Sequence, residues 1–301
     1  MKISVIQQLF TCGYDFREGT PDLAVLRARG ERRVEECLSL IEEAAKQGCD
    51  LAVTIETVNG FLALGDTTYP YEEIYEGIDG ATVKKFSDCA KRLHIYLVAG
   101  LLITIDGVTY NCAVLFDRNG DIVGIHRKVH LPAGEELHVG AGDRFEVFST
   151  EFGNIGMLVC WDMQYPEAAR ELALGGADLI CCPTLGWENV YGLSRAYENS
   201  VTIAAAMTAF EGNAFSINNP SCVVDNMGRV IAVAPMGETC VVTAEVDIKK
   251  EPAPQYGSAY FYPSHSMRKT RFSQRRPDTY KLANAENSTL PLYQRYFDDK
   301  K

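Results

Sequence analysis

The residue whose surroundings most clearly suggest chemistry is Cys160. The apolar run 154–159 predicts a strand that ends at this thiol, and Pro166 with Glu167 predicts the first turn of a helix just beyond it. A thiol at the carboxyl end of a strand, facing the start of a helix, lies beside unpaired backbone N–H groups and a partial positive charge that favour its thiolate. Cys160 is therefore a candidate nucleophile, and a buried structural thiol is the alternative for this window alone.

Two other predicted strands also end at chemically useful side chains. Glu56 follows the apolar run 50–55, and Lys128 follows the run 121–125. A carboxylate, an ammonium and a thiol are the groups needed to take up a proton, to stabilise an oxyanion and to attack a carbonyl carbon. Either charged residue alone could belong to a surface ion pair. Together with Cys160, they predict a thiol-dependent hydrolytic site.

The order glutamate, lysine, cysteine resembles the nitrilase superfamily of carbon–nitrogen hydrolases, and the resemblance spans nearly the whole chain. Glu135, eight residues before Asp143, resembles the family's second glutamate. The other segments similar to the family's sequence blocks are 109–111 before the lysine, 153–167 around the cysteine, 195–199 and 275–280. Each block alone is weak evidence, but their common order and spacing are specific.

The resemblance implies that Glu56, Lys128, Cys160 and Glu135 are catalytic. Glu56 would take the proton of Cys160, and the thiolate would attack an amide-type carbonyl. Lys128 and a backbone N–H near Trp161 would stabilise the oxyanion, and water would then hydrolyse the thioester. Glu135 would orient Lys128 or the NH₂ group of the substrate. The expected activity is hydrolysis of a carbon–nitrogen bond, other than a peptide bond, in a linear amide, with release of ammonia.

The residues beyond the nucleophile narrow the expected substrate. Residues 160–162, Cys-Trp-Asp, resemble amidases and carbamoyl-amine hydrolases, whereas nitrilases proper more often carry Cys-Trp-Glu. Segment 182–187 is similar to that of N-carbamoylputrescine amidohydrolases. Met163 and Gln164 offer no guanidinium to clamp a carboxylate, so we expect a small neutral or cationic amide or ureide. The candidate substrate-binding residues are Asn111, Trp161, Gln164, Thr184 and Trp187.

Two other classes of function stay open at this point. A nitrilase that converts a nitrile to its acid would share every catalytic residue, and only turnover of a nitrile separates it from an amidase. A noncatalytic, thiol-rich interaction protein would keep the fold without the chemistry. Preferential alkylation of Cys160 over the nine other cysteines would argue against that second class.

Alternating strand-like and helical patterns predict an α/β fold. The helical patterns are 31–47, 81–93, 166–174 and 191–200. The strand-like runs are 2–8, 50–55, 95–103, 109–117, 121–125, 154–160, 178–182, 201–208, 229–234 and 240–246. Tight turns at 106–107 and 119–120 require antiparallel pairs, hence mixed sheets. The resemblance implies a four-layer α-β-β-α sandwich with two mixed sheets, in a single domain over residues 1–301 whose tail, 251–301, lies at an interface.

Composition and charge limit the partners. A net charge of −11 argues against nucleic acid or an anionic membrane. Ten cysteines scattered through apolar segments, with no long apolar span or signal sequence, predict reduced thiols and a cytoplasmic protein. No CxxC pair occurs, and His126 and His130 lack zinc-site partners, so we expect no metal and no other cofactor. The expected partners are the amide or ureide substrate and, from the resemblance and the aromatic tail 290–297, further copies in a homodimer or higher homo-oligomer.

Overall fold

The computed structural model describes residues 1–10, 22–60, 69–210, 220–250 and 266–292. The chain forms two compact units, Met1–Lys250 and Glu251–Lys301. Most of the aromatic tail segment 290–297 lies outside the described residues. Within the described ranges, no helix has the length and apolar character needed to cross a lipid bilayer.

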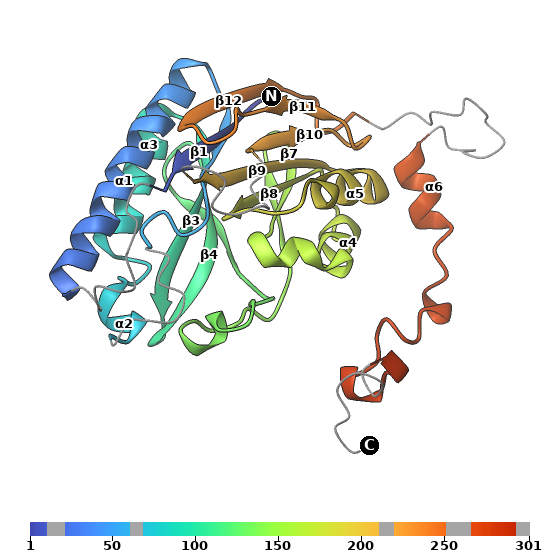
Figure 1. Ribbon diagram of the computed structural model, residues 1–301. Coiled ribbons are helices and arrows are strands. Elements are labelled where there is room, and N and C mark those ends of the chain that lie inside the picture. The colour runs from blue at the N-terminus through green and yellow to red at the C-terminus, as the bar shows by residue number, and fades with distance from the viewer. Residues whose placement is uncertain (11–21, 61–68, 211–219, 251–265, 293–301) are drawn as a thin grey trace. The chain divides into compact units, whose positions relative to one another are not determined.

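The unit Met1–Lys250 is built in four layers, with helices outside and strands inside (Figure 1). One outer layer holds α1 (Leu23–Lys46) and α3 (Ala81–Leu93), and the other holds α4 (Pro166–Leu174) and α5 (Asn189–Asn199). The half-sheet under α1 and α3 contains β1 (Lys2–Leu9), β2 (Leu51–Val53), β3 (Tyr96–Ile105), β4 (Val108–Phe116), β5 (Ile122–Arg127) and β12 (Cys240–Glu245). The half-sheet under α4 and α5 contains β6 (Val147–Thr150), β7 (Gly153–Met157), β8 (Leu179–Thr184), β9 (Thr202–Ala209), β10 (Cys222–Val224) and β11 (Val230–Val233).

The two half-sheets are mixed and are joined at one point. Strands β1, β2 and β3 are parallel, as are β7, β8 and β9, whereas β4, β5, β6, β10, β11 and β12 add antiparallel pairs. The last two residues of β1, Gln8 and Leu9, pair in parallel with Thr208 and Ala209 of β9. This short ladder makes the two predicted sheets one continuous twelve-stranded sheet. The predicted fold class is confirmed.

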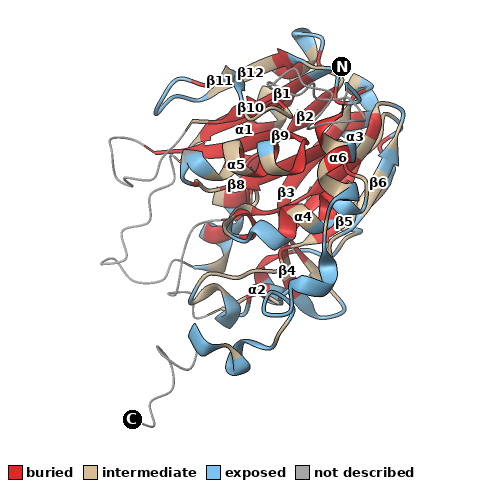
Figure 2. Cartoon of the chain, turned by 90° about the vertical axis from the view of Figure 1, so that its right-hand side faces the viewer, coloured by how far each residue is buried: buried red, intermediate tan, exposed pale blue. Residues whose placement is uncertain are grey.

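Alternation along the strands builds two cores. In β3, the buried side chains of Leu97 and Leu101 pack in the cluster formed with α1 and α3, whereas Val98 belongs to the cluster between the half-sheets. Met157 of β7 and Cys181 of β8 meet Val98 in that inner cluster. A strand that is buried on both faces has a continuous apolar sequence, so it can be predicted well from the sequence. Figure 2 shows these strands buried between helices that keep exposed outer faces.

Most predicted elements agree with the structure, and the exceptions have physical reasons. Helices α3 and α4 have the predicted bounds, 81–93 and 166–174. Helix α1 begins eight residues before the predicted start at 31. Glycine disfavours helix interiors, so the predicted helix starts after Gly30, whereas the observed helix continues through it. A Cβ at Gly30 would lie 2.5 Å from the carbonyl oxygen of Asn59, so close packing requires glycine there. The short strands β6 and β10 and the single-turn helix α2 (Tyr71–Ile74) were not predicted.

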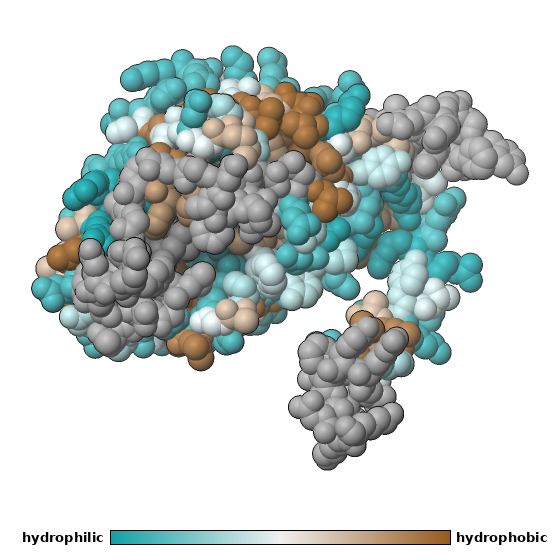
Figure 3. Space-filling model, in the orientation of Figure 1, coloured by the Kyte–Doolittle hydropathy of each residue, from teal (hydrophilic) through white to brown (hydrophobic). Residues whose placement is uncertain are grey.

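Strand β11 carries an apolar surface. Val230, Ile231 and Val233 are exposed on it, and Met236 is exposed just beyond its end. Apolar atoms gather on the upper face of the molecule near this strand (Figure 3). The strand pairs with β10 in the sheet.

The unit Glu251–Lys301 has little regular structure among its described residues. Helix α6 (Met267–Ser273) starts at Ser266, whose hydroxyl accepts a hydrogen bond from the backbone N–H of Lys269 at 3.2 Å. Two 3₁₀ turns follow, Pro277–Thr279 and Asn287–Thr289.

Gly100 of β3 lies where the layers pack closely against each other. A Cβ at this position would collide with the carbonyl oxygen of Ile55 and lie 2.9 Å from Pro183 Cβ of β8. We expect Gly100→Ala to lower the free energy of unfolding by about 1–3 kcal/mol, as measured by urea denaturation. Gly77→Ala is the control, because the nearest atom to its new Cβ would be 3.6 Å away. Equal effects of the two substitutions would contradict the packing argument.

Candidate active site

Cys160 lies in a strained turn rather than at the end of a strand. Strand β7 ends at Met157, and Cys160 opens the 3₁₀ turn Cys160–Gln164 with φ at +45°. A non-glycine residue with positive φ is uncommon, and such strain collects at functional sites. The helix predicted after the nucleophile, α4, begins at Pro166 as expected, so the 3₁₀ turn lies between it and β7. Cys160 is half-buried.

Glu56 is held beside β3 by an extension of β2. The backbone N–H of Thr54 donates to Val98 O at 2.9 Å, and that of Val58 donates to Gly100 O at 2.8 Å. The side chain of Glu56, between these two contacts, is buried. The next residue, Thr57, has φ at +47°, which is unusual for a β-branched residue.

Lys128 continues the antiparallel pairing of β5 with β4 by one residue. Its backbone N–H donates to Asn111 O at 2.8 Å. Its ammonium is buried and donates to Glu56 Oε1 at 2.9 Å and to Glu135 Oε2 at 2.7 Å. The structure therefore brings together three of the four residues predicted to be catalytic through direct contacts.

Asn111 joins the same network from β4. Its Nδ2 donates to Glu56 Oε1 and to Glu135 Oε1, both at 2.8 Å. Only the NH₂ end of the amide can donate to two carboxylates, and this fixes the orientation of the side chain. Its Oδ1 is buried and has no hydrogen-bond partner among the described residues.

The charges shift the pKa values of the buried groups. Burial disfavours the charged form of Lys128, yet the Glu56 carboxylate, the Cys160 sulfur and the Glu135 carboxylate raise its pKa above the ordinary value, so it stays an ammonium. Burial and the negative charge of Glu56 raise the pKa of Glu135, and Lys128 opposes that rise. One ammonium thus faces two carboxyl groups.

The thiol of Cys160 differs from the expectation in one respect. The sequence predicts that the start of a helix favours its thiolate, but burial, followed by the negative charge of Glu56, raises the pKa of Cys160 to about 12. Lys128, the Thr184 side chain and the Leu185 backbone act in the opposite direction. The resting thiol is therefore protonated near neutral pH and needs a base.

The segment after β8 connects the carboxylate with the thiol. The backbone N–H of Leu185 donates to Glu56 Oε2 at 2.8 Å. The Cys160 thiol points to the carbonyl oxygen of Gly186 at 3.9 Å, and Thr184 Oγ1 accepts from the backbone N–H of Gly186 at 3.1 Å. Thr184 therefore lies close to Cys160. The hydrogen bond from the Leu185 N–H was not predicted, because residue types do not show where a backbone N–H points.

The remaining predicted substrate-binding residues lie on the α4–α5 side. Trp161 follows the thiol and is 36 % exposed. Gln164 Oε1 accepts from Tyr191 Oη at 2.6 Å. Trp187 is buried, and its ring packs against Gly192 of α5: a Cβ added at this glycine would lie 3.0 Å from the ring. These contacts anchor Gln164 and Trp187 to α5.

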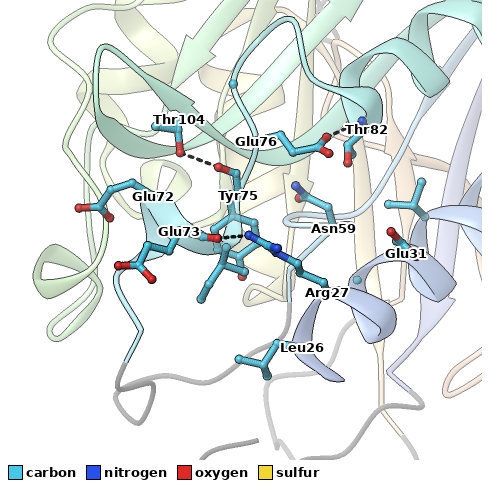
Figure 4. A pocket seen from close by; sticks show the side chains of 14 residues that line it. Leu26, Arg27, Glu31, Asn59, Glu72, Glu73, Tyr75, Glu76, Thr82 and Thr104 are labelled. Carbon is cyan, nitrogen blue, oxygen red and sulfur yellow. Dashed lines mark hydrogen bonds between the residues drawn. The ribbon is translucent and has the colours of Figure 1, made fainter. Parts of the chain in front are cut away.

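A separate cavity of about 610 Å³ lies between α1, α2 and the start of α3 (Figure 4). Two of its polar side chains are engaged: Arg27 donates to the carbonyl oxygen of Glu73 at 2.5 Å, and Glu76 Oε2 accepts from the backbone N–H of Thr82 at 2.7 Å. None of the residues predicted to be catalytic or substrate-binding is among the described residues that line it. Within the described chain, no three His, Cys, Asp or Glu side chains are grouped to hold a metal ion.

The charges around Cys160 predict opposite effects of two substitutions. Glu56→Gln removes a charge that raises the pKa of the thiol, so Cys160 should ionise at lower pH than in the unmodified protein. Lys128→Met removes a charge that lowers this pKa, so Cys160 should ionise at higher pH. The ultraviolet absorbance of the thiolate, titrated with Cys160→Ser as the blank, measures both. Shifts in the same direction would contradict the electrostatic account.

The chain is similar to known proteins over most of its length. The family model described as carbon–nitrogen hydrolase matches residues 5–251. The omega-amidase NIT2 of Mus musculus is 32% identical over 254 residues, which cover 78% of this chain and 90% of that protein. The probable nitrilase C965.09 of Schizosaccharomyces pombe is 31% identical over 213 residues, 67% of this chain and 74% of that one.

Solved structures share the fold. A carbon–nitrogen hydrolase from Helicobacter pylori G27 superposes with a TM-score of 0.74 at 23% identity, covering 95% of this chain and 98% of that one. An amidase from Nesterenkonia sp. AN1, solved in complex with butyramide, has a TM-score of 0.68 at 21% identity, covering 82% and 91%. The extent of the family match and the identity to the omega-amidase show that this chain belongs to the carbon–nitrogen hydrolases of the nitrilase superfamily.

Proposed function

We propose that this protein hydrolyses a small amide or N-carbamoyl amine through a thioester on Cys160 and releases ammonia. The observation that carries the proposal is the buried contact of Lys128 with Glu56 and Glu135, at 2.9 and 2.7 Å, beside a protonated thiol. An isolated buried ammonium would be costly, and its pairing with two carboxylates next to a nucleophile is the arrangement that acyl transfer needs.

In the first half of the reaction, Glu56 removes the proton of Cys160 as the sulfur attacks the substrate carbonyl carbon. The new C–S bond forms while the C=O π pair moves to the oxygen. The Lys128 ammonium and the N–H of Trp161, which follows the thiol in the 3₁₀ turn, would stabilise that oxyanion. A base is required because the pKa of Cys160 is raised to about 12.

In the second half, the same carboxyl group changes roles. Protonated Glu56 gives its proton to the departing nitrogen, the C–N bond breaks, and ammonia leaves a thioester on Cys160. Glu56, again a carboxylate, takes a proton from water as the water attacks the thioester carbonyl carbon. The C–S bond then breaks, the acid is released, and Glu56 returns the proton to the Cys160 sulfur. Hydrogen bonds from Lys128, Asn111 and the backbone of Leu185 hold both oxygens of Glu56 in place throughout.

Glu135 has a supporting role in this scheme. Its carboxylate oxygens contact Lys128 Nζ and Asn111 Nδ2, so it fixes the direction of the ammonium that meets the oxyanion. Asn111 Oδ1, which has no partner among the described residues, is an acceptor available for an NH₂ group of the substrate.

Several observations favour a neutral or amine-bearing substrate. A structural neighbour was solved with butyramide, a neutral amide. The name of a relative, omega-amidase, supports an amide as substrate but does not bear on its charge. Residues 163 and 164 carry no guanidinium. The guanidinium of Arg195, which contacts Gln164, is already engaged: Nη1 donates to Glu198 Oε1 and Nη2 to Gln164 O, at 3.2 and 3.1 Å.

The catalytic set can be tested by substitution. We expect Cys160→Ala, Lys128→Ala and Glu56→Gln each to lower ammonia release by about 10³-fold or more while the protein stays folded, because residues that act as a unit lose function together. Ammonia release from short amides and circular dichroism measure the two outcomes. Cys181→Ala, a buried thiol in the inner core, is the control and should lower stability while turnover continues. Near-normal turnover in any of the three variants would remove that residue from the mechanism.

The products separate an amide from a ureide. Hydrolysis of an N-carbamoyl amine leaves a carbamoyl thioester, so complete turnover yields carbon dioxide with ammonia and the amine, whereas an amide yields acid and ammonia only. We expect activity on amides or carbamoyl amines that carry no carboxylate, in a screen that measures ammonia and carbon dioxide together and includes nitriles. A preference of tenfold or more, about 1.4 kcal/mol in transition-state binding, for a carboxylate-bearing ureide over its neutral analogue would contradict this proposal.

We also propose that the chain works as a homodimer or higher homo-oligomer and that its tail, 251–301, contributes to the interface as part of one functional domain. The apolar side chains of Leu282 and Leu292 in this tail are exposed, and such groups are commonly covered in assemblies. Light scattering at micromolar concentration should give at least twice the mass of one chain. A monomer mass for the full chain would reject the proposal.

A further inference from the structure

Asp162, two residues after the nucleophile, is a fully buried carboxylate that accepts five hydrogen bonds. Its Oδ1 accepts from the backbone N–H groups of Val129 and His130, at 3.2 and 2.9 Å, and contacts His130 Nδ1 at 2.9 Å. Its Oδ2 accepts from the backbone N–H of Val159 at 3.1 Å and contacts His126 Nε2 at 2.9 Å. The sequence marked this residue only as an indicator of substrate subclass.

These bonds connect two segments that carry the chemistry. His126, Val129 and His130 flank Lys128, which follows β5 in one half-sheet. Val159 precedes Cys160, which follows β7 in the other half-sheet. One carboxylate therefore ties the backbone on either side of the ammonium to the turn that carries the thiol.

The same carboxylate closes the strained turn. The backbone N–H of Asp162 donates to Val159 O at 3.0 Å, while its side chain accepts from Val159 N–H. Cys160 lies inside this closed loop with φ at +45°. A strained residue keeps such a conformation only when its surroundings fix it, and Asp162 supplies that constraint.

Aromatic packing holds the two histidines against the carboxylate. The ring of Phe145 stacks on those of His126 and His130, with centroids 5.7 and 6.0 Å apart. Tyr165, just after the turn, stacks on His130 at 3.8 Å. The contacts come from both sides of the site, so the cluster is rigid and satisfies the buried carboxylate.

We propose that Asp162 is a positioning residue for the reaction: it sets the separation and orientation of the Lys128 ammonium and the Cys160 thiol, without touching the substrate. The inference rests on the proposed function. Residues 126, 130 and 162 would together position Lys128 and Cys160, a role that none of the proposed catalytic residues has. Because both oxygens of Asp162 meet backbone N–H groups, an amide at this position must turn its NH₂ toward at least one of those donors.

The test is Asp162→Asn, with Asp225→Asn as the matched control. Asp225 is also a buried carboxylate that accepts from backbone N–H groups, those of Met227 and Arg229, but in the turn between β10 and β11. We expect Asp162→Asn to lower kcat at least tenfold with KM changed less than threefold. The rate of Cys160 alkylation by iodoacetamide at neutral pH, followed by mass spectrometry, should fall at least tenfold as well. Asp225→Asn should lower only the melting temperature.

His130→Leu protects the test against a variant that does not fold. It removes one side-chain contact to Asp162 and leaves all the backbone bonds, so we expect a threefold or greater loss of kcat with little change in KM or melting temperature. Values of kcat and alkylation rate within twofold of the unmodified protein, in whichever of the two variants are folded, would overturn the proposal. So would equal losses of kcat in Asp162→Asn and Asp225→Asn.

The alkylation rate separates this inference from the proposed function. If the unmodified protein releases no ammonia from any amide or carbamoyl amine, the proposed function fails. The reactivity of Cys160 toward iodoacetamide still reports whether Asp162 positions the thiol, because that reaction needs only the thiol and its surroundings.

Discussion

The organisation of the site depends on one buried ammonium. Lys128 is enclosed by protein, and an uncompensated charge there would cost several kcal/mol. Glu56 and Glu135 both contact it, and Asn111 donates to both carboxylates, so the cluster compensates itself only when all four side chains are in place. Removal of one partner from a buried ion pair typically costs about 3–5 kcal/mol, so the geometry on which the proposed reaction depends also stabilises the fold.

This charge arrangement determines how the thiol can react. Two carboxyl groups face one ammonium, and the negative charge of Glu56 acts with burial to keep Cys160 protonated. A protonated thiol is a poor nucleophile until a base removes its proton. In the proposed reaction, this proton passes to Glu56 as the oxyanion develops beside Lys128, because the ammonium then meets the growing negative charge. The same ion pair would thereby couple proton transfer to attack.

The sequence predicted the fold where burial alone decides it. Strands such as β3 and β8 are apolar on both faces, and α4 begins at a proline, so local residue types determine them. It also placed Glu56 and Lys128 at strand ends, and the structure brings their side chains into contact. Contacts that depend on distant backbone were not predicted. The N–H of Leu185 on Glu56 and the burial of Asp162 arise only when separate segments fold together. The raised pKa of Cys160 has the same origin.

The position of the site follows from how the two half-sheets meet. Glu56 and Lys128 extend β2 and β5 of one half, whereas Cys160 and Leu185 follow β7 and β8 of the other. The inner core, with Val98 and Met157 among its members, sets the distance between the halves, and Gln8 and Leu9 of β1 join them by strand pairing. Close packing in that core therefore holds Glu56 and Cys160 in a fixed relative placement. The hydrogen bonds of Glu56 with Leu185 and of Asp162 with His130 cross the same boundary. They therefore fix the two halves relative to each other at the site, as the packed core does over the rest of the boundary.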